Sequence, residues 1–62
     1  MPLIQISQAS DQTPEQKRDL VRAVTEAYCA ATGTNREKVW VIVQQIQRED
    51  WAIGGSPLSD RT

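Results

Sequence analysis

The sequence contains no histidine, and this absence removes much of the chemistry that enzymes use. Ser-His-Asp and Cys-His catalytic groups cannot be built without an imidazole, the side chain that most often titrates near neutral pH. Cys29 is the single cysteine, so an internal disulfide is impossible and a structural zinc site lacks its usual ligands. We expect no metal and no other cofactor, and general-base catalysis here would need an unusual base.

Strong charge and long apolar segments are also missing. The formal net charge is −1, which provides no basic face for nucleic acid. No apolar run approaches the roughly 20 residues of a membrane span, and the N-terminus does not have the pattern of a signal peptide. We therefore expect a cytoplasmic protein with neither a nucleic-acid partner nor a membrane partner.

The chain has 62 residues, so we expect a single domain spanning residues 1–62. A chain of this length buries only about 60% of the surface that its unfolded form exposes. Small folds are usually stabilised by disulfides, a metal or oligomerisation, and the composition leaves only the last of these. Self-association is therefore expected.

The first half of the chain predicts a strand followed by an amphipathic helix. Alternating apolar residues indicate a strand over residues 3–8. A helix is expected over 14–32, because Thr13 is a suitable N-cap, Pro14 takes the first helical position and Gln16 can close a capping box. Gly33 is suited to end it. The expected apolar stripe comprises Leu20, Val21, Val24, Ala27, Tyr28 and Ala31, with Cys29 on nearly the opposite side as a subunit contact or surface thiol.

The second half predicts a parallel partner strand. A short turn capped by Asn35 leads into an apolar, β-branched run over 39–43, typical of a strand buried on both faces. Strand, crossover helix and strand form a βαβ unit in the α/β class, with two parallel strands, one long helix and a C-terminal hairpin or loop. One face and both edges of such a sheet stay open, which again predicts association of subunits.

Pro2 follows the initiator methionine directly. Methionine is commonly removed before a small residue, which would leave Pro2 with a free secondary amine. An α-amino group has an unperturbed pKa near 8, and burial lowers the pKa of a cationic group, so a neutral amine becomes available as a general base. From the residues alone, the competing interpretation is that Pro2 merely begins a strand, where its missing N–H does no harm.

Five segments together resemble the 4-oxalocrotonate tautomerase family: "PLIQIS", "TPEQKRDLVRAVTEA", "ATG", "VWVIVQQI" and "WAIGG". They occur in the family's order and cover almost the whole chain. The resemblance implies βαβ subunits assembled as homodimers and homohexamers. It also implies that Pro2 is catalytic and moves a proton between carbon and oxygen of enol and keto acids.

The chain departs from the family pattern at two positions. Family members that isomerise 2-hydroxymuconate carry arginines at the positions of Gln12 and Trp40, and an aromatic pocket wall, usually phenylalanine, at the position of Trp51. Glutamine and tryptophan cannot bind a carboxylate through a guanidinium fork. The resemblance thus implies a substrate site of Trp51, Trp40 and Gln12 around Pro2. Whether another arginine replaces the missing pair stays open, the candidates being Arg36, Arg48 and Arg61.

The sequence therefore predicts a tautomerase, an isomerase that uses Pro2 for keto–enol proton transfer on a small carbonyl compound or 2-oxo acid. Two alternatives remain open. The first is hydration or dehalogenation of an unsaturated acid, with protonated Pro2 as the acid. The second is a non-catalytic oligomeric binding protein, which the loss of both arginines favours.

Overall fold

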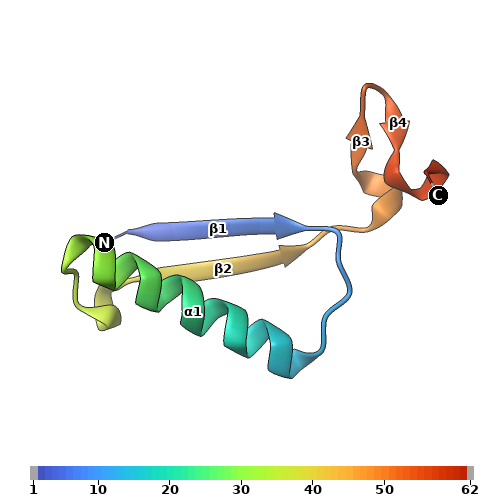
Figure 1. Cartoon of the computed structure of the whole chain (residues 1–62). Coiled ribbons are helices and arrows are strands. Elements are labelled where there is room, and N and C mark those ends of the chain that lie inside the picture. The colour runs from blue at the N-terminus through green and yellow to red at the C-terminus, as the bar shows by residue number, and fades with distance from the viewer. Residues whose placement is uncertain (1, 62) are drawn as a thin grey trace.

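The computed structural model describes residues 2–61, so Met1 and the fate of its peptide bond lie outside the described residues, as does Thr62. A long helix lies along one face of a two-stranded sheet, and a small hairpin projects beyond the far end of that sheet (Figure 1). The predicted α/β unit, with its parallel strands and C-terminal hairpin, is confirmed. The elements are β1 (Leu3–Gln8), α1 (Pro14–Thr32), β2 (Trp40–Gln45), β3 (Ala52–Ile53), β4 (Ser56–Pro57) and three short 3-10 turns at Arg36–Lys38, Arg48–Asp50 and Leu58–Asp60.

The second strand begins and ends later than the sequence predicted. The strand expected over 39–43 is observed as β2, Trp40–Gln45. Val39 is not part of it. Its N–H donates to the Arg36 carbonyl and ends the turn capped by Asn35. The apolar run ends at Val43, but parallel pairing with β1 continues to Gln45. The bounds of the strand follow the length of its partner rather than its own hydrophobicity.

The two faces of the β1–β2 sheet differ in exposure. Half-buried apolar residues alternate with exposed residues along each strand. The half-buried ones are Ile4, Ile6, Val41 and Val43. On the opposite face, the exposed fractions of three large apolar side chains are 49% for Leu3, 54% for Trp40 and 48% for Ile42. The sheet thus has one covered face and one bare apolar face, as predicted for an isolated βαβ unit.

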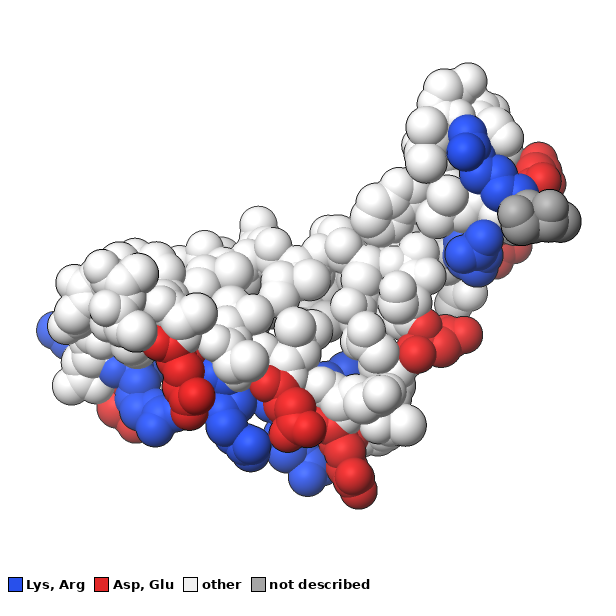
Figure 2. Space-filling model, in the orientation of Figure 1, with Lys and Arg blue, Asp and Glu red and all other residues white. Residues whose placement is uncertain are grey.

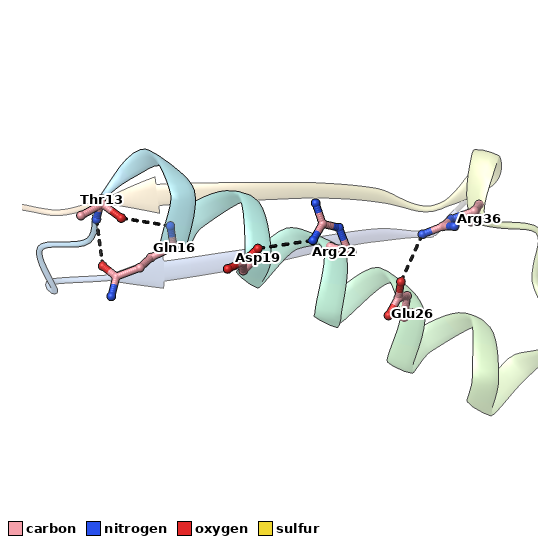
Figure 3. A network of polar contacts seen from close by, with 6 residues as sticks. All are labelled: Thr13, Gln16, Asp19, Arg22, Glu26 and Arg36. Carbon is pink, nitrogen blue, oxygen red and sulfur yellow. Dashed lines mark hydrogen bonds and ion pairs between the residues drawn. The ribbon is translucent and has the colours of Figure 1, made fainter.

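Both ends of α1 have the predicted caps. The Thr13 hydroxyl accepts the Gln16 N–H at 3.1 Å, and the Gln16 side chain accepts the Thr13 N–H at 2.9 Å (Figure 3). Gly33 adopts a left-handed φ of 75° and donates its N–H to the Cys29 carbonyl at 2.8 Å. The helix therefore begins and ends where these local signals place it.

Replacing Thr13 with alanine tests the contribution of the N-terminal cap. The substitution leaves the Gln16 N–H without its partner and should lower the free energy of unfolding by about 1 kcal/mol. Urea unfolding at one fixed protein concentration measures this, because assembly makes stability depend on concentration. Ser10→Ala, which removes a hydroxyl from an exposed position in the loop before the helix, is the control. Equal losses at the two positions would contradict a specific role for the cap.

The face of α1 that turns inward is rotated from the predicted stripe. Ala27 and Ala31, expected on the inner face, are exposed, whereas Thr25 and Cys29 are half-buried. The prediction that Cys29 lies opposite the inner face is therefore wrong. Small alanines leave little to distinguish the two sides, so contact with β2 decides which side of the helix faces the sheet.

The molecule is too extended to enclose a core of its own. Its radius of gyration is 14.6 Å, whereas a compact chain of this length has about 11 Å. Among residues 2–61, no side chain is fully buried. Within the same range, no helix has the length and apolar character needed to cross a membrane. The bare sheet face and the projecting hairpin are therefore available for contact with other subunits.

Candidate active site

Pro2 and Trp40 lie together where the parallel strands begin. Pro2 immediately precedes β1 and is half-buried. Its carbonyl oxygen accepts the N–H of Trp40 at 3.0 Å, and the next pair in the ladder joins Leu3 to Trp40. The backbone of Pro2 is thus held by the sheet, and Trp40, to which it is joined, is 54% exposed with its side chain on the bare face.

Gln12 is attached to the opposite end of the sheet. Its side-chain oxygen accepts a hydrogen bond from Nε2 of Gln8, the last residue of β1, at 2.6 Å. The loop between β1 and α1 positions the Gln12 side chain, and both glutamines are half-buried. Nε2 of Gln8 also lies 3.4 Å from Oε1 of Gln45, the last residue of β2. Sequence reasoning singled out Gln12 but missed Gln8.

Trp51 lies at the base of the β3–β4 hairpin and is half-buried. The Trp51 carbonyl accepts the Leu58 N–H at 2.7 Å, and the Leu58 carbonyl accepts Nη2 of Arg48 at 2.9 Å. The N–H of Trp51 donates to the Arg48 carbonyl at 3.4 Å, so hydrogen bonds connect Trp51, Leu58 and Arg48 to one another. The position of the Trp51 backbone is thus fixed from both sides.

A single chain does not bring the four predicted site residues together. Pro2 and Gln8 are six residues apart on an extended strand, which corresponds to about 20 Å. Trp40 lies at the Pro2 end, whereas Gln12 is bonded to the Gln8 end and Trp51 follows the end of β2. A pocket containing all four must therefore combine residues from more than one subunit.

Two of the three candidate replacement arginines have partners in the structure. Nη2 of Arg36 lies 3.5 Å from Oε1 of Glu26 on α1 (Figure 3), and Arg48 is bonded to the hairpin as described above. Arg61 is exposed, and its backbone N–H donates to the Leu58 carbonyl. None of these contacts directs a guanidinium toward Pro2.

An open cavity of about 260 Å³ lies beyond the ends of β1 and β2. Its wall includes Gln45, and its charged lining residues are Asp11, Arg48 and Glu49. Pro2 and Trp40 do not line it. Among residues 2–61, no three side chains that commonly bind metals gather into a cluster.

The two long strands carry none of the charges of the molecule, since neither β1 nor β2 contains a charged residue. In the space-filling view, acidic and basic side chains gather along α1 and at the C-terminal end, while the surface over β1 is uncharged (Figure 2). The strands that carry Pro2 and Trp40 are therefore uncharged, and the nearest charges along the chain are those of the turn Arg36–Lys38, which ends two residues before Trp40.

The fold is thus a small α/β unit of the βαβ type, with Pro2 directly before its first strand. A sequence model described as "Tautomerase enzyme" matches residues 2–61. The chain is 38% identical over 60 residues to the 2-hydroxymuconate tautomerase of Bacillus subtilis strain 168, covering 97% of each chain. The protein therefore belongs to the tautomerase family, and with it to the isomerases.

Solved structures agree with this assignment. A homologue of 4-oxalocrotonate tautomerase called YwhB superposes with a TM-score of 0.92 at 36% identity, over 98% of this chain and 100% of that one. A heterohexameric 4-oxalocrotonate tautomerase from Chloroflexus aurantiacus J-10-fl gives a TM-score of 0.90 at 29% identity, over the whole of both chains. The predicted tautomerase-like fold is confirmed.

Proposed function

We propose that Pro2, freed by removal of Met1, is the general base and acid of a keto–enol tautomerase. The observation that carries the proposal is the position of Pro2 in a chain of this family: it is half-buried at the start of β1, and Trp40 holds its carbonyl. The strand fixes the direction of the amine, and a neutral secondary amine can take a proton from carbon and return it to oxygen or carbon.

We further propose that the substrate is a small carbonyl compound or 2-oxo acid with little charge and an apolar, preferably aromatic, group. Trp40 presents an uncharged, exposed aromatic side chain at the end of the sheet where Pro2 lies, and this side chain is proposed to stack against the substrate. Gln12 supplies a neutral amide where a dianionic substrate would need a cation. Trp51, on its fixed hairpin, is proposed as the second aromatic wall.

The separation of Pro2 from Gln12 supports an assembled enzyme whose site lies between subunits. A strand length of about 20 Å exceeds the span of a small substrate, so Gln12 and Trp51 of one subunit would serve Pro2 of another. The bare apolar face of the sheet gives such subunits a surface to bury. We propose a homodimer that assembles further into a homohexamer, with residues 1–62 as one domain. The cytoplasmic location stays a prediction.

Sedimentation tests the assembly. Because residues 2–61 include no fully buried side chain, a folded monomer of 7.0 kDa is not expected to persist at micromolar concentration. Velocity sedimentation combined with circular dichroism should show folded protein only as oligomers. A folded monomer in that range would contradict the shared site.

The product distinguishes tautomerisation from the alternatives on the same scaffold. Incubation of the enzyme with an arylpyruvate enol in deuterated water should give the keto isomer with deuterium at carbon 3 faster than an enzyme-free sample does, as followed by proton NMR. Halide release from a haloacrylate, or a hydrated product, would favour the lyase-type alternative. Binding without turnover of any of these compounds would favour a non-catalytic binding protein.

A further inference from the structure

The β3–β4 hairpin carries Trp51 at its base and has little support of its own. Its strands are two residues long, Ala52–Ile53 and Ser56–Pro57, and they are joined by Gly54 and Gly55 with φ of 59° and 85°. Positive φ at both positions is what a type I′ turn requires. A two-stranded hairpin is marginally stable in water, and this one projects beyond the β1–β2 sheet (Figure 1). The contacts at its base therefore matter for the position of Trp51.

The ladder of the hairpin is incomplete at that base. Ile53 and Ser56 flank the two-residue turn, and hydrogen-bonded and non-hydrogen-bonded pairs alternate outward from this closing pair. Pro57, which has no N–H, lies in the non-hydrogen-bonded pair that follows. Trp51 and Leu58 come next, where a regular ladder has two hydrogen bonds. Here there is one, from the Leu58 N–H to the Trp51 carbonyl at 2.7 Å.

Arg48 satisfies both groups that the missing bond leaves. Its carbonyl oxygen accepts the N–H of Trp51 at 3.4 Å, and its Nη2 donates to the carbonyl of Leu58 at 2.9 Å. The turn Arg48–Asp50 also contacts the turn Leu58–Asp60. One residue thus binds both partners of the incomplete pair, and its guanidinium makes the shorter of the two bonds.

We propose that Arg48 is a positioning residue that completes the base of the hairpin and thereby fixes Trp51 as an aromatic wall of the substrate site. The inference rests on the proposed function, which places Trp51 at that site. A ring that is already fixed stacks on an aromatic substrate without being ordered at the moment of binding, so fixing it favours affinity. Because Arg48 acts through Trp51, it matters for substrates that carry a ring and not for those that lack one.

Direct binding of a substrate carboxylate is the competing role for Arg48. Its guanidinium has five N–H donors, and Arg48 lines the open cavity of about 260 Å³. Asp11 and Glu49 line the same cavity, so two carboxylates accompany the one guanidinium. Like charges repel, and this lining disfavours an anionic ligand. The charges and the contact with Leu58 both favour the positioning role.

Kinetics with two 2-oxo acids separate the two roles. An arylpyruvate is the substrate, and 2-oxobutyrate, which has the same carboxylate but no ring, is the competing inhibitor. Arg48→Met removes the donors and keeps an unbranched stem, so KM for the arylpyruvate should rise about two- to tenfold, as expected when an aromatic contact is weakened. The inhibition constant of 2-oxobutyrate should stay unchanged.

Two further variants provide the controls. Arg48→Lys keeps one donor for the Leu58 carbonyl, and one donor is all that this bond needs, so it should restore most of the loss in Arg48→Met. Arg22→Met makes the same change on the exposed surface of α1 and should alter neither constant. Sedimentation should show all three proteins assembled.

The mobility of Trp51 in ligand-free protein gives a test that needs no activity. The heteronuclear NOE of its indole Nε1–H should fall in Arg48→Met and stay unchanged in Arg48→Lys and Arg22→Met. An unchanged NOE in Arg48→Met would overturn the positioning role. Equal losses for the arylpyruvate and 2-oxobutyrate would also overturn it, because they would assign Arg48 to the shared carboxylate.

The remaining outcomes separate this inference from the proposed function. A more mobile indole with an unchanged KM would overturn the contact between Trp51 and the substrate while leaving catalysis by Pro2 intact. Failure of the unmodified protein to tautomerise an arylpyruvate, even with Pro2 free, would instead reject the proposed function.

Discussion

Chains that retain Met1 are expected to be at least about 100-fold slower as tautomerases than chains that begin at Pro2. Retention of Met1 converts the amine of Pro2 into a tertiary amide, which has no useful basicity. General acid–base groups typically contribute about 100- to 10,000-fold in rate, so the whole of that contribution should disappear. The measurement is kcat/KM with one arylpyruvate for two preparations whose N-termini are defined by intact mass.

Pro2→Ala is the informative companion variant. Once processed, it keeps a primary amine at nearly the same position but loses the ring that fixes its direction, so part of the activity should survive. Retention of Met1 should therefore cost more than the substitution. Sedimentation should show both proteins assembled, which separates a chemical defect from a folding defect. Equal rates for the retained and processed forms would mean that Pro2 only begins a strand.

The second large effect concerns substrate charge. The protein should process an arylpyruvate better than 2-hydroxymuconate, because Gln12 and Trp40 provide no cation for a dicarboxylate. Introducing Gln12→Arg and Trp40→Arg together should reverse this preference. A hydrogen bond to a charged group contributes about 1.5–3 kcal/mol, so each arginine should raise kcat/KM for the dianion by roughly 10- to 100-fold.

Lysine at the same two positions provides the control for charge alone. An ammonium group carries the charge without the planar fork, so Gln12→Lys with Trp40→Lys should give a smaller gain than the arginine pair. Comparing kcat/KM for both substrates across the three proteins measures the effect. If the unmodified protein already prefers the dicarboxylate, then a cation such as Arg61 must serve the site, and the proposed substrate class is wrong.

Local sequence signals predicted most of the fold because the structure uses them directly. The capping box at Thr13 and the left-handed Gly33 set the ends of α1 at the predicted residues. The turn capped by Asn35 was likewise found where the sequence placed it. These features depend on neighbours within a few residues, and such neighbours can be read from the chain.

Features that depend on contacts between distant segments were not predicted. The end of β2 follows its register with β1, which no property of residues 39–45 reveals. The half-burial of Cys29 depends on how α1 rolls against the sheet, and the flanking alanines do not specify that rotation. In both cases the partner surface, absent from the local sequence, decides the outcome.

The candidate site shows the same division. The four site residues were predicted from their alignment with the family pattern, and their roles stay proposals. They are Pro2, Gln12, Trp40 and Trp51. The geometry adds what alignment could not supply: Pro2 and Gln12 lie at opposite ends of a strand. Gln8 escaped notice because a glutamine at the end of a strand is ordinary in sequence. Only the meeting of three chain segments gives it a partner in Gln12.

The most direct test of the central claim is a single time course. A preparation that retains Met1 is treated with methionine aminopeptidase, and samples are removed for intact mass and for the rate of arylpyruvate tautomerisation. If the amine of Pro2 carries the proton, the rate rises in proportion to the fraction of chains that begin at Pro2, on a line through the origin. A rate that stays constant as that fraction rises would contradict the account.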